Sequence, residues 1–137
     1  MDLKLSSHTP TEAEVEAIES VLGPADSSWC GGDRTADDHH VARGGHDVRA
    51  ERHRLLPVLH AVNNRVGWIS RGAINHIAER LDVAPAEIHG VATFYGLFSV
   101  TERPSRQVHV CIDLACQIAG AEVPEGAHPS PCLGLCE

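Results

Sequence analysis

The sequence predicts an α+β chain in which a bundle of helices comes first and a short, cysteine-bearing segment with a strand follows. Three observations support this prediction. Apolar residues recur with helical spacing as far as residue 95. An alternating, β-branched run appears only after Pro104. Four of the five cysteines lie within residues 111–137, so the candidate metal-binding or redox residues cluster in the C-terminal part of the chain.

Composition and charge exclude several classes of protein. The 137 residues suit one domain, or one domain with a helical extension. A net charge of −8 argues against a nucleic-acid partner. No apolar run approaches the ~20 residues that span a bilayer, and MDLKLSSHTP lacks the pattern of a secretory signal. We therefore expect a cytoplasmic protein without direct membrane insertion.

Residues 1–23 are predicted to contain an amphipathic helix. Thr9 can cap it, Pro10 suits its first position, and Glu12 completes a capping box. Gly23 and Pro24 then end it. Its apolar stripe comprises Val15, Ile18, Val21 and Leu22.

Residues 24–48 are predicted to be a flexible linker, because Gly, Asp, Ser and His dominate and no apolar period survives. Three histidines (His39, His40 and His46) could bind a metal, but solvated linker side chains are the commoner case. Cys30 is interpreted as an incidental free cysteine rather than a redox thiol.

Residues 49–103 are predicted to form a bundle of three short helices. The first begins near Arg54 or kinks at Pro57, and Gly67 caps its C-terminal end. Ser70 caps the second helix, and Pro85 opens the third. Helices this short are marginal alone, so packing must stabilise them.

Residues 104–137 are predicted to hold a strand at 107–112 and one or two helical turns at 116–121. Cys111 would then lie near the end of the strand, and Cys116 would open the helix. Unpaired N–H groups at a helix start favour an anion, so a thiolate suits that place.

The four C-terminal cysteines form a Cys-x4-Cys pair and a Cys-x3-Cys pair: Cys111, Cys116, Cys132 and Cys136. Four thiolates suit tetrahedral zinc or an iron–sulfur cluster. The spacings are wider than the commonest zinc pairs, which favours a [2Fe–2S] cluster. A zinc-stapled interaction module remains the alternative, and disulfides or ligation by His109 or His128 are less favoured. Without a Cys-x-x-Cys motif, a thiol oxidoreductase is disfavoured.

The sequence from residue 52 to residue 137 resembles a known family. It is similar to the thioredoxin-like [2Fe–2S] subunit of respiratory complex I and to small subunits of NAD-dependent formate dehydrogenases and bidirectional hydrogenases. The two cysteine pairs follow the motifs that carry the resemblance, which are LLPVLH at 55–60, GWIS at 67–70, IAERL at 77–81 and GVATFY at 90–95.

The resemblance implies a helical bundle followed by a thioredoxin-like [2Fe–2S] ferredoxin domain, with the four cysteines as cluster ligands. It implies a flavin-bearing NADH-oxidising partner subunit, which would carry FMN and NAD, and further iron–sulfur subunits. The chain alone would then carry electrons and catalyse nothing. The short gap between Cys116 and Cys132 implies a shortened, incomplete domain, which a longer or fused polypeptide or a partner would complete.

Overall fold

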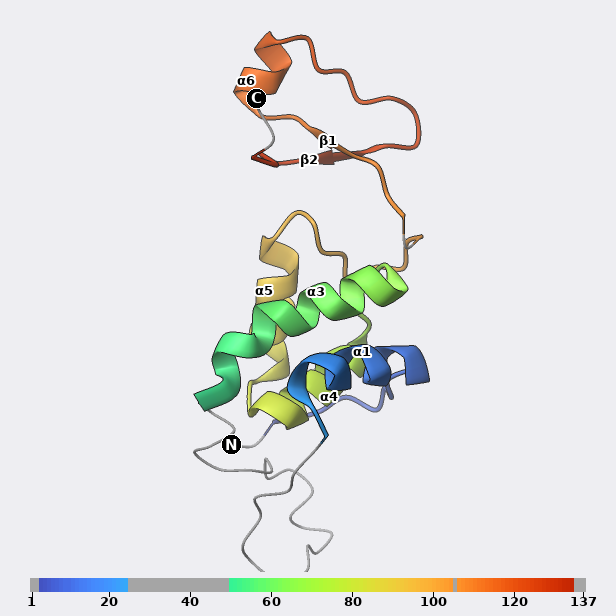
Figure 1. Cartoon of the computed structure of the whole chain (residues 1–137), viewed down its shortest axis with the longest axis vertical. Coiled ribbons are helices and arrows are strands. Elements are labelled where there is room, and N and C mark those ends of the chain that lie inside the picture. The colour runs from blue at the N-terminus through green and yellow to red at the C-terminus, as the bar shows by residue number, and fades with distance from the viewer. Residues whose placement is uncertain (1–2, 25–49, 105, 135–137) are drawn as a thin grey trace, which may run out of the picture.

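The computed structural model describes residues 3–24, 50–104 and 106–134 and contains a helical bundle with a small lobe at one end (Figure 1). The order of elements is four α-helices and a 3-10 turn, then a β1–α6–β2 unit. This confirms the predicted α+β class and the order of its two parts. Apart from Pro24, the predicted 24–48 linker lies outside the described residues, as do Cys30, its three histidines and Cys136.

Helix α1 (Glu12–Leu22) begins two residues later than the capping pattern suggested. Thr11, not Thr9, is its N-cap: the Thr11 side chain accepts a hydrogen bond from the Glu14 N–H, and the Glu14 carboxylate accepts one from the Thr11 N–H at 2.7 Å. Thr-x-x-Glu spacing occurs at both positions. The helix starts at the second because Thr9 and Pro10 belong to an extended arm that packs on another helix.

The other three helices begin and end close to the predicted positions. A 3-10 turn, η2 (Glu51–Arg54), leads into α3 (Leu55–Val66), so the helix begins just before Pro57 rather than kinking there. Gly67 adopts the left-handed conformation after α3, and the Ser70 side chain caps α4 (Arg71–Leu81). Helix α5 (Pro85–Phe94) has proline in its first turn.

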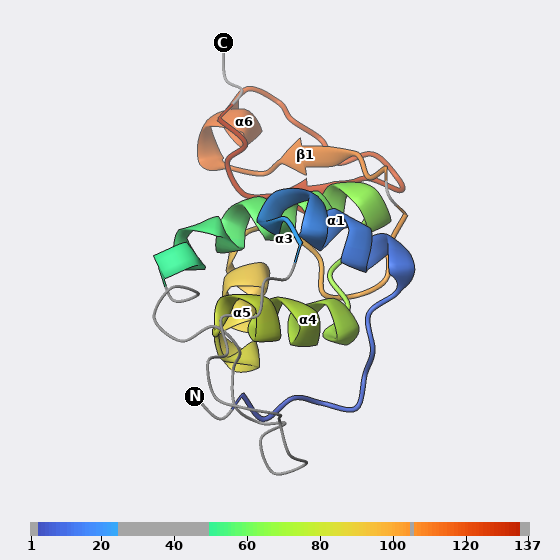
Figure 2. The ribbon, with the colours of Figure 1, turned by 60° about the horizontal axis from the view of Figure 1, so that its bottom comes forward.

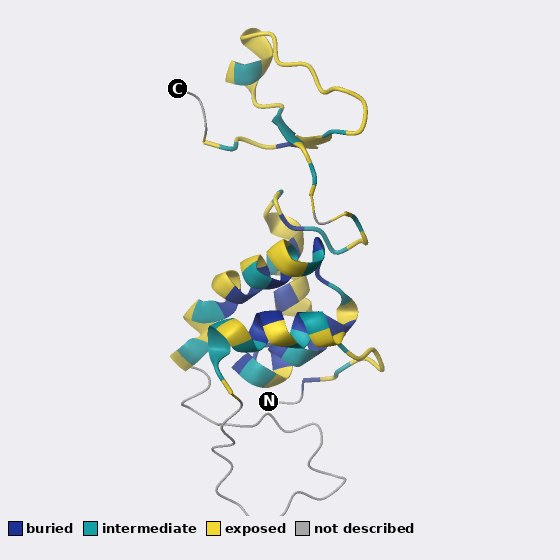
Figure 3. Ribbon diagram, turned by 45° about the vertical axis from the view of Figure 1, so that its right-hand side comes forward, coloured by how far each residue is buried: buried dark blue, intermediate teal, exposed yellow. Residues whose placement is uncertain are grey.

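All four helices contribute to one aliphatic core (Figure 3). Helix α1 packs mainly on α3 and also touches α4, while α5 packs on α4. The fully buried side chains with the largest volumes include Ile18, Leu59, Ile69, Ile77, Leu81 and Ile88. Among the described residues, no buried hydrophobic side chain lies beyond Phe98 in the sequence, so this core belongs to the bundle alone.

An extended N-terminal arm lies against α4. The Asn75 side-chain amide donates to the carbonyl oxygens of Ser6 and His8, at 2.9 and 2.7 Å, and its oxygen accepts from the Ser6 N–H at 3.2 Å. Gly72, one turn earlier on α4, meets the arm so closely that an added Cβ would lie 2.1 Å from the Thr9 carbonyl oxygen. The arm therefore fits because α4 has no side chain at residue 72.

The C-terminal lobe is built from β1 (His109–Cys111), α6 (Leu114–Ile118) and β2 (His128–Ser130). The strands pair in parallel, with Cys111 opposite Ser130. Strand β2 was not predicted, because His-Pro-Ser has no alternation and proline is rare in strands. Two views agree that the lobe lies at one end of the bundle, with α4 on the side away from it (Figures 1 and 2). None of the helices described here is long and apolar enough to cross a membrane.

Candidate metal centre

Parallel pairing brings two of the predicted ligand positions to the same edge of the sheet. The carboxyl ends of parallel strands meet at one edge, where ligands commonly bind. Cys111 is the last residue of β1, as predicted, and it pairs with Ser130, the last residue of β2. Cys132 follows two residues later. The first and third cysteines therefore leave the sheet from the same side.

Helix α6 brings the second cysteine back toward the first. The side chain of Asp113 caps the helix by accepting from the Ala115 N–H, and the helix begins at Leu114. Cys116 therefore lies inside the first turn, two residues after the helix start, and does not open the helix as predicted. Its thiol hydrogen-bonds to Cys111, so the first pair of predicted ligands is in contact.

The surroundings of Cys111 favour a thiolate. Its pKa is lowered chiefly by the backbone N–H of Asp113, then by the hydrogen bond from Cys116 and by the backbone N–H of Leu133. Partial burial and the Asp113 carboxylate oppose this effect without cancelling it. Hydrogen bonds to the charged form of a group favour that form. Leu133 comes directly after Cys132, so the loop that bears the third cysteine reaches the first pair.

The structure brings the predicted ligands together only in part. Cys111 and Cys116 touch, whereas Cys132 is exposed. Cys136 lies outside the described residues. Within residues 3–24, 50–104 and 106–134, no three His, Cys, Asp or Glu side chains converge as a metal site. The donor chemistry nevertheless fits an iron–sulfur group, because the two thiols in contact have backbone N–H groups directed at one sulfur.

Ser130 is a buried polar residue that the sequence did not single out. Its side chain is completely buried and its hydroxyl lies 2.6 Å from His109 Nδ1. Its carbonyl oxygen accepts from the Ile112 N–H at 2.9 Å. The rings of His109 and His128 meet edge to face, and the pKa of His109 is lowered mainly by burial, with smaller effects of Arg103 and His128. Ser130 thus fixes the residues that precede Cys132.

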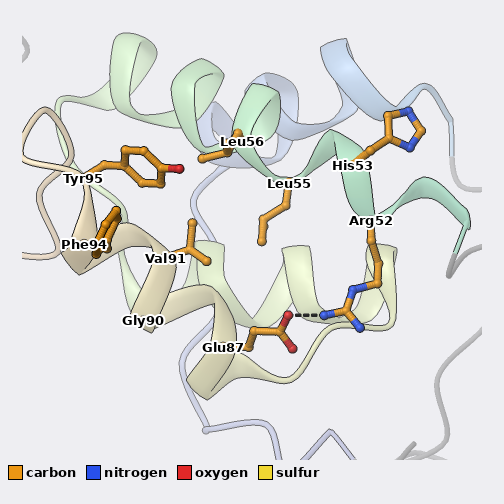
Figure 4. A pocket seen from close by; sticks show the side chains of 9 residues that line it. All are labelled: Arg52, His53, Leu55, Leu56, Glu87, Gly90, Val91, Phe94 and Tyr95. Carbon is orange, nitrogen blue, oxygen red and sulfur yellow. Dashed lines mark hydrogen bonds and ion pairs between the residues drawn. The ribbon is translucent and has the colours of Figure 1, made fainter.

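A separate apolar groove of about 640 Å³ lies between α3 and α5, and none of the described cysteines lines it (Figure 4). An ion pair between Arg52 and Glu87 spans one end, and Phe94 and Tyr95 lie at the other. Neither aromatic side chain is buried in the core, because Phe94 is 80% exposed and Tyr95 is 43% exposed. The groove is lined by Arg52, His53, Leu55, Leu56, Glu87, Gly90, Val91, Phe94 and Tyr95.

The chain matches a model of a known protein family. Residues 42–125 match the family model of the thioredoxin-like [2Fe–2S] ferredoxin. The matched region includes the whole of η2, α3, α4, α5, β1 and α6, and therefore the first cysteine pair. It ends before Cys132.

Curated relatives carry related names. The chain is 35% identical to NADH-quinone oxidoreductase subunit 2 of Thermus thermophilus over 52% of its own length and 39% of that protein. It is 24% identical to another NADH-quinone oxidoreductase subunit, from Aquifex aeolicus, over 63% of this chain and 66% of the relative. It is 28% identical to the NADP-reducing hydrogenase subunit HndA of Solidesulfovibrio fructosivorans, over 50% and 40%. The chain therefore spans less than two thirds of each of these relatives.

Proposed function

Because the chain belongs to the thioredoxin-like [2Fe–2S] ferredoxin family, we propose that it is an electron-transfer subunit or domain of an NAD-linked oxidoreductase. A [2Fe–2S] cluster, which carries one electron at a time, would be held by four thiolates: Cys111, Cys116, Cys132 and Cys136. The proposed ligand-bearing segment is residues 104–137, and the proposed bundle is residues 49–103. Reducing compartments keep cysteines as thiols rather than disulfides, which favours the cytoplasm for a protein with four thiolate ligands.

One observation carries this proposal: the Cys111 sulfur receives hydrogen bonds from Cys116 and from the backbone N–H of Leu133. The fold of the chain alone therefore brings the first pair of cysteines close to the loop that bears Cys132. The N–H groups of Asp113 and Leu133 favour negative charge on sulfur. Such donors would also stabilise the negative charge of an iron–sulfur group.

Metal and sulfide analysis tests the proposal. The chain is purified without oxygen, and its iron, acid-labile sulfide and zinc are measured together with its visible spectrum. We expect two iron and two sulfide per chain, red-brown colour, and a paramagnetic resonance signal after reduction. Stoichiometric zinc without sulfide would instead support the zinc-stapled module, and the electron-transfer proposal would be wrong.

The proposed partner is a flavin-bearing NADH-oxidising subunit that carries FMN and NAD, in an assembly with further iron–sulfur subunits. Formate dehydrogenase, hydrogenase and complex I are the proposed types of assembly. Two relatives are named as subunits of an NADH-quinone oxidoreductase and one as a subunit of an NADP-reducing hydrogenase, which supports this class of complex. The lobe exposes five large apolar side chains that a partner or further chain would cover: Val108, Ile112, Leu114, Ile118 and Val123.

Native purification from the source cell tests the partner. We expect the chain to elute with a protein that contains FMN and oxidises NADH. A homogeneous, stable monomer with no affinity for such a protein would contradict the partner assignment while leaving the cluster assignment intact.

A further inference from the structure

The geometry points to Gly96 as a positioning residue: the turn after α5 sets the place of Pro131 and, through it, of the ligand Cys132. This inference rests on the proposed function, because it concerns the third of the proposed ligands. It adds a role for the bundle, which would act as the surface against which the loop that bears Cys132 is placed.

The first observation is a close approach between the two parts of the chain. A Cβ added at Gly96 would lie 2.6 Å from Cδ of Pro131 and 2.8 Å from Cγ, and real Cβ atoms essentially never come within 3.0 Å of another heavy atom. Gly96 does not have a positive φ, so its backbone would accept alanine. Glycine is needed here for space, not for conformation. The ring of Pro131 therefore rests directly on the backbone of the turn.

The second observation is how firmly the neighbouring residue is held. Ser130 is fully buried, although His128, Pro129 and Pro131 around it are exposed. It is fastened to β1 through its hydroxyl, 2.6 Å from His109 Nδ1, and through its carbonyl oxygen, which accepts from Ile112. The residues just before Cys132 are thus held by β1 and touch the bundle. If Pro131 moves, its neighbours in the chain, Ser130 and Cys132, must move with it.

The third observation is that the turn belongs rigidly to the bundle. The Leu97 carbonyl oxygen accepts hydrogen bonds from the side chains of Asn63 and Arg103. Arg103 also donates to the Gly67 carbonyl oxygen at 2.9 Å. Phe98 is buried in the core, and its N–H donates to the Tyr95 carbonyl oxygen. The turn therefore cannot yield easily, and extra bulk at residue 96 should displace Pro131 and Cys132 instead.

The test compares two glycine-to-alanine variants of the cluster-loaded chain. Gly96→Ala should shift the midpoint potential of the cluster and the g-values of its reduced form, because one thiolate has moved. Gly90→Ala is the matched control, because an added Cβ there has no neighbour within 4 Å. Its potential and g-values should equal those of the unmodified chain. A Gly96→Ala variant with unchanged potential and g-values overturns the inference.

A second substitution removes the atoms in contact. Pro131→Ala lacks Cγ and Cδ, so adding Gly96→Ala to it should change neither the potential nor the g-values further. If the two substitutions act independently, the inference is wrong. If Gly96→Ala alone does not fold, folding of the double variant with the spectrum of Pro131→Ala supports the contact, and failure of the double variant contradicts it.

A readout that needs no cluster separates this inference from the proposed function. An unmodified chain without iron and sulfide overturns the function. The contact is then judged by hydrogen exchange of the Ile112 amide, which donates to Ser130. Exchange should be about tenfold faster in Gly96→Ala and should return to the Pro131→Ala rate in the double variant. Equal rates in Gly96→Ala and the unmodified chain would show that the turn does not position the ligand loop.

Discussion

At the scale of single residues, the surroundings of Cys111 differ from those of an ordinary surface cysteine. Two backbone N–H groups and a neighbouring thiol favour its ionised form. These donors come from both sides of the site, because Asp113 follows β1 and Leu133 follows β2. The ionisation of the Cys111 thiol therefore depends on the fold of the whole lobe, although the residue itself belongs to β1.

Substitution of each cysteine by serine should separate ligands from bystanders. Cys111→Ser, Cys116→Ser and the variants at Cys132 and Cys136 should each lose the cluster, because a hydroxyl is a poorer ligand for iron than a thiolate. Cys30→Ser is the control and should keep full iron, sulfide and visible absorbance. The measurement is the visible spectrum together with paramagnetic resonance after reduction. Cluster loss at Cys30, with a normal signal in one of the other four, would disprove the ligand set.

What the sequence could predict at this scale follows from local spacing. The two pairs and the position of Cys111 at the end of a strand are local features, and they were predictable. Ser130 and Gly96 were not, because their importance comes from contacts with residues far away in the chain: His109 for Ser130 and Pro131 for Gly96. Phe94 has helical spacing relative to Ile88 and Val91, which is typical of a core position, yet its side chain is 80% exposed.

At the scale of elements, the packing of the N-terminal arm on α4 depends on one missing side chain. Gly72→Ala should lower the free energy of unfolding by about 1–3 kcal/mol, since the new methyl group would clash with the backbone of Thr9. Gly90→Ala, in the exposed part of α5, should be neutral or stabilising by up to ~1 kcal/mol. Denaturant unfolding followed by circular dichroism measures both. Equal stability of the two variants would show that the arm does not pack on α4 in solution.

The helices were predictable because their ends carry local signals. Ser70, Gly67 and Pro85 each act within one turn, and each was assigned its role from the sequence. Strand β2 carries no such signal. Its existence depends on pairing with β1 across the intervening chain, and two of its three residues, His128 and Pro129, are exposed. The capping site of α1 was misplaced because two identical spacings compete.

At the scale of the whole molecule, the two parts differ in what stabilises them. The bundle has a continuous aliphatic core, while most residues of the lobe are exposed (Figure 3). Among described residues of the lobe, the one fully buried side chain is that of Ser130. Metal binding commonly supplies folding energy where burial is small.

Removal of the metal should therefore destabilise the lobe and leave the bundle unaffected. Chelation under reducing conditions should speed hydrogen exchange of the Ile112 amide without abolishing its protection, and it should retain most of the helical circular dichroism. Amides of α4 serve as the internal control and should remain protected. Loss of protection in α4 together with the lobe would show that the two parts unfold as one unit.

The exposed aromatic end of the groove should contribute to partner binding. Phe94→Ser should weaken binding to the flavin-bearing subunit by about tenfold or more, since a buried aromatic anchor commonly contributes over 1 kcal/mol. Stability should change little, because the ring is 80% exposed. His89→Ser, at an exposed position of the same helix that does not line the groove, is the control and should leave the affinity unchanged. Unchanged affinity in the Phe94 variant would place the contact elsewhere.

The parallel pairing of β1 and β2 has a consequence for the order of events on the ribosome. Synthesis runs from the N-terminus, and domains tend to fold as they emerge. The bundle core is complete once Phe98 has left the exit tunnel, and Cys111 and Cys116 come next. The residues that connect α6 to β2, and β2 itself, must then be synthesised before Pro131 can contact the turn at Gly96. A nascent chain thus presents a folded bundle and two cysteines before the rest of the site exists, and maturation has to wait until the second cysteine pair has emerged.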